Sequence, residues 1–115
     1  MSDERRTETR LHQQATVYVE VQASDYGDAT PPRVVVCNSV DISANGLQVR
    51  MDDPLPVGTI LRLCAEFHDA REPLYLVGEV RWLRQETEGY AIGFSLFEAD
   101  QSDISGWKSL VASRL

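Results

Sequence analysis

Apolar and polar residues alternate with a period of two along most of the chain. In the first such stretch Val17, Val19 and Val21 alternate with more polar neighbours, as expected of a strand with one buried face. Further strand-like stretches follow, separated by polar turns, at residues 33–40, 47–51, 59–67, 74–85 and 90–97. Short strands at this regular spacing predict an all-β fold, an antiparallel barrel or sandwich of six strands.

The stretch at residues 74–85 is long and contains a glycine. Its period of two places Leu76, Gly78, Val80 and Trp82 on one face. A glycine inside a strand marks a bend or a bulge, which closed or strongly curved sheets require. We therefore expect this strand to bend at Gly78.

The C-terminal residues change to a helical period. Ile104, Trp107 and Val111 recur at the spacing of one helix face, with Ser102 or Asp100 as the expected N-cap. This amphipathic helix is expected to lie across one mouth of the barrel and to bury the large apolar surface of Trp107 there. A partner-binding segment would show the same pattern.

Length and composition bound the class of protein. The chain has 115 residues, enough for one domain with one core. Because no apolar run approaches the roughly 20 residues of a membrane span and the N-terminus lacks the apolar region of a signal peptide, we expect a soluble cytoplasmic protein without membrane insertion. The two cysteines, Cys37 and Cys64, have no CxxC spacing and are expected to be buried, reduced thiols.

The net charge narrows the possible partners. A formal net charge of −7 disfavours nucleic-acid polymers and anionic membranes, because those partners bind to broad basic surfaces. Residues 5–10 nevertheless carry three arginines against one glutamate. This local positive charge suits a small anion, although a solvated tail would have the same composition.

Two short motifs carry the candidate chemistry, RxxxR at residues 6–10 and DxSxxG at residues 41–46. Arginines offer planar forks to phosphate oxygens and to the O6 and N7 atoms of guanine, and a carboxylate accepts hydrogen bonds from guanine N1–H and the exocyclic amine. Either motif alone is weak, since the second also matches a self-satisfied polar turn. Together they predict a site for an anionic guanine nucleotide.

The chain resembles the PilZ domain, a six-stranded antiparallel β-barrel found in bacterial receptors for cyclic di-GMP. The resemblance rests on both motifs and on the later segments GEVRW at 78–82 and IGF at 92–94, and it covers almost the whole chain. It implies a PilZ-like barrel with a C-terminal α-helix, with RxxxR before the first strand and DxSxxG between the second and third. The ligand-binding residues that it implies are Arg5, Arg6, Arg10, Asp41, Ser43, Gly46 and, unless its side chain is merely part of the core, Trp82.

The resemblance also implies a role for each residue. Asp41 would accept hydrogen bonds from the Watson–Crick edge of guanine and thereby reject adenine, and Ser43 would offer its hydroxyl to a phosphate or base. Gly46 would supply a backbone conformation or a close approach that a side chain would block. The arginines would provide forks and stacking planes. Arg5, as an additional arginine, favours an intercalated pair of cyclic di-GMP molecules, which carries twice the phosphate charge of one molecule.

The expected organisation has three parts: a flexible arm at residues 1–14, a barrel at 15–98 and a capping helix at 99–115. Ligand binding is expected to order the arm across the barrel and to create a surface for a downstream protein, which the sequence does not identify. We expect a monomer or weak homodimer, with no metal and no cofactor besides this ligand. The resemblance suggests motility or biofilm formation as regulated processes.

Two other classes of function remain open. The chain could be a PilZ-like protein interaction module whose nucleotide site is unused. It could also be an enzyme, which we do not expect, because His12, His68 and Ser43 lie in no catalytic motif. The acidic pairs at 52–53 and at 100 and 103 are interpreted as turn and helix-start residues.

Overall fold

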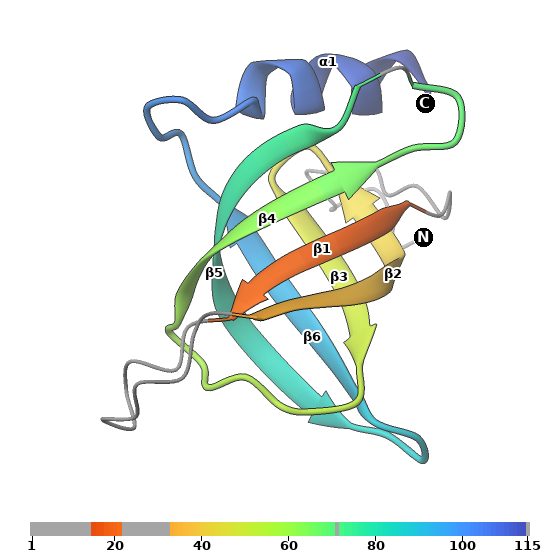
Figure 1. Ribbon diagram of the computed structural model, residues 1–115, viewed down its shortest axis with the longest axis vertical. Coiled ribbons are helices and arrows are strands. Elements are labelled where there is room, and N and C mark those ends of the chain that lie inside the picture. The colour runs from red at the N-terminus through yellow and green to blue at the C-terminus, as the bar shows by residue number, and fades with distance from the viewer. Residues whose placement is uncertain (1–14, 22–32, 71, 115) are drawn as a thin grey trace, which may run out of the picture.

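The structure is a computed structural model that describes residues 15–21, 33–70 and 72–114. Within these ranges the chain forms six strands and one helix (Figure 1). The elements in chain order are β1 Thr16–Val21, β2 Arg33–Ser43, β3 Gly46–Met51, β4 Ile60–Glu66, β5 Leu74–Gln85, β6 Tyr90–Leu96 and α1 Ile104–Ser113.

The strands form a closed barrel in the order β1-β2-β3-β6-β5-β4. Every neighbouring pair is antiparallel, and the pairing of β1 with β4 closes the barrel. Each strand in the described ranges therefore has a partner on both sides, which removes the exposed edges of an open sheet. The prediction of a six-stranded antiparallel barrel with a C-terminal helix is confirmed.

The apolar residues of the alternating pattern fill the interior of the barrel. Val17 and Val19 of β1 are fully buried, and Leu61, Leu63 and Ala65 of β4 face the same core. Burying one such Val or Leu side chain stabilises a fold by about 1.5 to 3 kcal/mol. The apolar positions of each strand therefore decide which of its two faces turns inward.

β2 is longer than its residue pattern indicates. It extends past the predicted end at Val40 because Asp41, Ile42 and Ser43 continue the ladder with β3. The register shifts between Ser39 and Asp41, so that Val40 is the extra residue of a bulge. The bulge lies directly before the residues of the DxSxxG motif.

The bulge of β5 lies at Arg81 and not at Gly78. The pairing with β6 shifts register between Val80 and Trp82, and the extra residue reverses the faces of the strand beyond it. Val80 is fully buried, whereas Trp82 points out of the barrel and is 38% exposed, so the prediction that they share one face is wrong. Gly78 is instead a close-packing position, where a Cβ would lie 3.0 Å from Cδ1 of Leu63.

The helix α1 lies across one end of the barrel (Figure 1). Trp107 anchors it: this side chain is 0% exposed, and its ring centroid lies 5.8 Å from that of Phe67. Its indole Nε1–H donates a hydrogen bond of 2.9 Å to the carbonyl of Ser43. In the described part of the chain, no helix combines the length and the apolar character needed to cross a membrane.

The N-cap of α1 is Asp103, and not Ser102 or Asp100 as predicted. Its carboxylate makes no capping hydrogen bond. It accepts instead from the backbone N–H of Tyr75 at 2.8 Å, while the N–H of Asp103 donates to the Tyr75 carbonyl at 2.6 Å. The helix start is therefore set by attachment to β5 rather than by a side-chain cap.

Both cysteines are free thiols. Cys37 is buried in the core, where its Sγ donates to the carbonyl of Val17 at 3.4 Å and burial raises its pKa to about 12. Cys64 is only half-buried, because its neighbours on β4 take the inward positions. The expectation of two buried thiols is therefore corrected for Cys64.

Candidate functional site

The DxSxxG motif forms the hairpin between β2 and β3. Asp41 and Ser43 belong to the end of β2, Ala44 and Asn45 form the turn, and Gly46 begins β3. The motif is thus part of the sheet and not a loop between two strands. Its side chains are positioned by the antiparallel ladder.

A row of residues crosses four adjacent strands beside this hairpin. Asp41 of β2 pairs with Gln48 of β3. Gln48 also pairs with Gly93 of β6, which in turn pairs with Trp82 of β5. Directly opposite residues of an antiparallel ladder point to the same face. A carboxylate, a carboxamide, a bare backbone and an indole therefore follow one another on the outer surface of the barrel.

The indole of Trp82 lies over the backbone of Gly93. A Cβ on Gly93 would overlap the Cε2 and Nε1 atoms of the indole, so only glycine leaves room for the ring in this position. The guanidinium of Arg84 lies 5.4 Å from the centroid of the same ring and donates to the carboxylate of Glu86 at 3.1 Å. The bulge of β5 is what turns Trp82 toward this row.

The residues of this row, together with the neighbouring hairpin, line a pocket of about 180 Å³. Its volume lies below the roughly 300 to 1,000 Å³ of pockets that enclose a drug-sized ligand, so the described strands supply only part of an enclosure for a dinucleotide. Its lining includes four of the predicted ligand-binding residues and, from the row across the strands, two residues that were not predicted in that role. They are Asp41, Ser43, Gly46 and Trp82, and then Gln48 and Gly93.

Gly46 allows a close approach between strands. A Cβ there would lie 3.2 Å from the carbonyl oxygen of Phe94 and 3.5 Å from Oγ of Ser43. Among the described glycines, positive φ occurs at Gly58 and Gly89 and not at Gly46. Of the two roles predicted for Gly46, the geometry therefore favours close approach over an unusual backbone conformation.

Two hydrogen bonds from other elements hold the hairpin in place. The carbonyl of Ser43 accepts from the indole of Trp107 at 2.9 Å, and the carbonyl of Asn45 accepts from the N–H of Leu96 at 2.9 Å. The first partner lies in α1 and the second at the end of β6. The hairpin is thus attached to both the capping helix and the barrel.

The first strand begins next to the same motif. The N–H of Ala15 donates to Oγ of Ser39 at 2.8 Å, and the N–H of Ser39 donates to the carbonyl of Ala15 at 2.9 Å. Ser39 is buried and precedes Asp41 by two residues. The chain that carries residues 1–14 therefore joins the described barrel close to Asp41.

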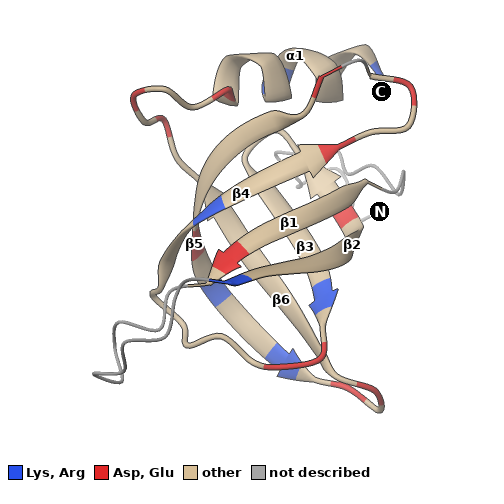
Figure 2. Cartoon of the chain, viewed as in Figure 1, with Lys and Arg blue, Asp and Glu red and all other residues tan. Residues whose placement is uncertain are grey.

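The predicted arginines, Arg5, Arg6 and Arg10, lie outside the described residues. In the described part of the chain, the carboxylates are concentrated in the turns, and several strand arginines lie toward the end of the barrel away from α1 (Figure 2). No three His, Cys, Asp or Glu side chains of this part gather where they could hold a metal ion.

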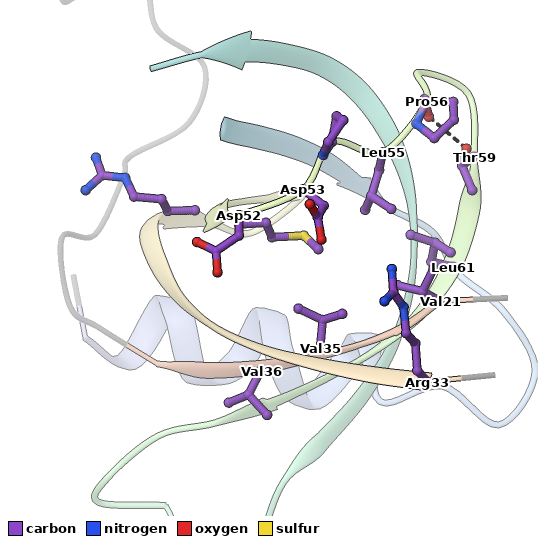
Figure 3. Close-up of a pocket in the computed structure, with 13 residues that line it drawn as sticks. Val21, Arg33, Val35, Val36, Asp52, Asp53, Leu55, Pro56, Thr59 and Leu61 are labelled. Carbon is purple, nitrogen blue, oxygen red and sulfur yellow. Dashed lines mark hydrogen bonds between the residues drawn. The ribbon is translucent and has the colours of Figure 1, made fainter. Parts of the chain in front are cut away.

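A second cavity lies at the end of the barrel opposite α1. It measures about 240 Å³ and is lined mainly by apolar side chains, among them Val35, Leu55 and Leu61 (Figure 3). The charged residues that line it are Arg33, Arg50, Asp52 and Asp53. None of the predicted ligand-binding residues that the structure describes lines this cavity, so it is separate from the pocket beside the hairpin.

Comparison with known proteins gives a family match over nearly the whole chain. A family model described as the PilZ domain matches residues 4–113. Among curated proteins, no match is found.

Two solved structures share the fold. The first is the inhibitor of motility MotI/DgrA of Bacillus subtilis, with a TM-score of 0.72 and 18% identity over 96% of this chain and 51% of that chain. The second is the PilZ domain of CeSA from a cellulose-synthesizing bacterium, with a TM-score of 0.59 and 19% identity over 92% of this chain and 97% of that chain. The chain thus spans about half the length of the MotI/DgrA chain.

Proposed function

Because the chain belongs to the PilZ domain family, we propose that it is a receptor for cyclic di-GMP that binds the nucleotide on the outer face of β2, β3, β6 and β5. One observation carries this proposal. Residues predicted separately from the DxSxxG motif and from β5, namely Asp41, Ser43, Gly46 and Trp82, line one pocket.

The chemistry of the pocket suits a guanine base. The carboxylate of Asp41 accepts from guanine N1–H and the amine, while the exposed indole of Trp82 offers a stacking surface worth about 1 to 3 kcal/mol per base. Ser43 and Gly46 border the same pocket, and glycine lets a flat ligand approach the backbone closely. Adenine lacks the donors that Asp41 requires.

The arm with the RxxxR motif supplies the other half of the proposed site. Arg10 precedes Ala15 by five residues, and a fully extended chain spans about 3.3 to 3.6 Å per residue. Since Ala15 is bonded to Ser39 beside the motif, Arg10 is within about 17 Å of that point. Arg6, four residues earlier, has a longer reach and can close over the phosphates.

The arginine content of the arm bears on stoichiometry. Arg5 adds a third cation to Arg6 and Arg10, which suits the phosphate charge of an intercalated pair of nucleotides. We therefore propose that two cyclic di-GMP molecules bind per chain. A titration that saturates at one molecule per chain would contradict this part of the proposal.

The proposed output is a changed protein surface. Ordering of residues 5–10 over bound nucleotide creates a composite of ligand, arm and strands that a downstream protein can recognise. The names of the structural neighbours refer to motility and to a cellulose-synthesizing bacterium, so regulation of motility or biofilm formation in the bacterial cytoplasm is the context we propose. Hydrogen exchange should slow in residues 5–10 when cyclic di-GMP is added.

Calorimetric titration with cyclic di-GMP tests the site. Arg6→Ala and Asp41→Ala should each lower affinity by at least about 10-fold, since a hydrogen bond to a charged group contributes about 1.5 to 3 kcal/mol. Matched controls are Arg62→Ala on the exposed face of β4 and Asp52→Ala in an exposed turn, which should bind as wild type.

The alternatives predict different results. A protein interaction module with an unused nucleotide site would show no saturable binding, or binding that Asp41→Ala leaves unchanged. An enzyme would convert the nucleotide during incubation, whereas a receptor returns it intact.

A further inference from the structure

Gln48 lines the pocket next to the DxSxxG residues without belonging to that motif. It lies directly opposite Asp41 on one side and Gly93 on the other. Directly opposite residues have Cβ atoms about 4.5 to 5.5 Å apart. A base that reaches from the carboxylate of Asp41 toward the indole of Trp82 must therefore pass over Gln48.

Two of the outward positions beside Gln48 are glycines, so no side chain at those positions covers its carboxamide. The preceding outward position on β3 is Gly46 and the facing position on β6 is Gly93, both without a side chain. The next outward position is Arg50, which turns to Glu86 with an N–O distance of 3.2 Å. Gln48 itself is half-buried and lines the pocket.

The chemistry of a carboxamide complements that of the neighbouring carboxylate. An ionised Asp only accepts hydrogen bonds, whereas Gln offers two N–H donors and an acceptor. A guanine whose N1–H and amine face Asp41 presents O6 and N7, both acceptors, on the adjoining edge. Those atoms require a donor, and Gln48 is the residue of the row that can donate from beside Asp41.

We propose that Gln48 is a guanine-contacting residue that donates from its carboxamide to O6 or N7 of the base held by Asp41. This inference rests on the proposed function and names a residue outside the RxxxR and DxSxxG motifs. Asp41 then selects the donor edge of guanine, while Gln48 reads the acceptor edge.

The test is calorimetric titration of full-length wild type, Gln48→Leu and Gln48→Glu with cyclic di-GMP. Gln48→Leu removes the donors and should weaken binding about 3- to 10-fold, the equivalent of one hydrogen bond of ordinary strength. Gln48→Glu also adds negative charge near the ligand and should weaken binding further. The matched control is Gln85→Glu at the exposed end of β5, which changes the net charge equally and should bind as wild type.

Cyclic di-IMP identifies the edge of the base that Gln48 contacts. Hypoxanthine keeps O6 and N7 but lacks the amine that faces Asp41. Gln48→Leu should therefore weaken cyclic di-IMP and cyclic di-GMP by the same factor. A loss seen only with cyclic di-GMP would place Gln48 at the amine and overturn the inference.

The possible failures are distinguishable. Wild-type affinity in Gln48→Leu, together with lost affinity in Asp41→Ala, would overturn the role of Gln48 and leave the receptor function intact. A wild-type protein that binds no cyclic di-GMP would overturn the receptor function and this inference with it.

Discussion

Gly93 is the residue on which the position of Trp82 depends. Any Cβ there would overlap the indole, so we expect Gly93→Ala to displace Trp82 from the pocket. Affinity for cyclic di-GMP should fall by about 10-fold or more, because base stacking on an aromatic side chain contributes about 1 to 3 kcal/mol. Calorimetry measures the loss.

The matched control for Gly93→Ala is Gly106→Ala in α1. A Cβ at Gly106 would make only an ordinary contact of 3.4 Å with Leu74, and alanine favours a helix over glycine by about 1 kcal/mol. This variant should bind normally and unfold at a slightly higher temperature. Unchanged affinity in Gly93→Ala would contradict the stacking role of Trp82.

Cys37 should make the fold sensitive to alkaline pH. Burial raises its pKa from 9.0 to about 12, so between these values the unfolded chain releases a proton that the folded chain keeps. The stabilisation is fully present below pH 9.0 and is lost as pH rises toward about 12.

Urea unfolding of wild type and Cys37→Ala across this alkaline range measures the effect. The decline in the free energy of unfolding should be shallower in the variant. Cys64→Ala is the comparison, because its thiol is half-exposed and less of its titration is coupled to folding. An identical alkaline slope in wild type and Cys37→Ala would contradict the account.

At the level of elements, α1 supports the hairpin that carries the DxSxxG motif. Trp107→Phe keeps most of the buried apolar surface but leaves the Ser43 carbonyl without its indole donor. Loss of one hydrogen bond costs about 0.5 to 1.5 kcal/mol, so the variant should unfold at lower denaturant concentration and bind cyclic di-GMP less tightly. Chemical denaturation and calorimetry measure the two effects. Loss of stability with wild-type affinity would show that α1 stabilises the barrel without positioning the site.

The start of β1 is the element that connects the arm to the site. Ser39→Ala removes the acceptor for the N–H of Ala15 while leaving Asp41 in place. We expect weaker binding of cyclic di-GMP and faster hydrogen exchange at the start of β1. The control is Ser95→Ala on β6, whose half-buried side chain does not line the pocket. If Ser39→Ala binds as wild type, the attachment of the arm at this point does not matter for the site.

Local periodicity predicted the strands because the apolar residues of each strand determine which of its faces points into the core. It could not predict the bulge at Arg81, since the extra residue is defined only by the pairing of β5 with β6. The period of two therefore placed Trp82 on the same face as Val80, although its side chain lies outside the barrel. The end of β2 was missed for a similar reason: Asp41 and Ser43 resemble turn residues, and only the ladder with β3 makes them part of a strand.

At the level of the whole molecule, the register of strand pairing in the barrel determines which residues lie together in the site. Asp41 and Ser43 belong to the DxSxxG motif. Gln48 belongs to no motif, and Gly93 lies in the IGF segment, which supported the family resemblance but had no predicted role in binding. Their place beside Asp41 and Trp82 follows from three strand pairings that join distant parts of the chain. The residue types of the site could be predicted from the sequence. Which of them lie next to one another could be known only from the strand pairing of the closed barrel.

The two tryptophans of the chain give it two separate optical probes. Trp107 is enclosed between α1 and the barrel, whereas Trp82 lies on the outer face with its ring under Arg84. A base that stacks on Trp82 should quench its emission and shield it from acrylamide, while Trp107 changes its emission only when α1 leaves the barrel. Fluorescence of unlabelled protein can therefore distinguish ligand binding from unfolding in a single titration.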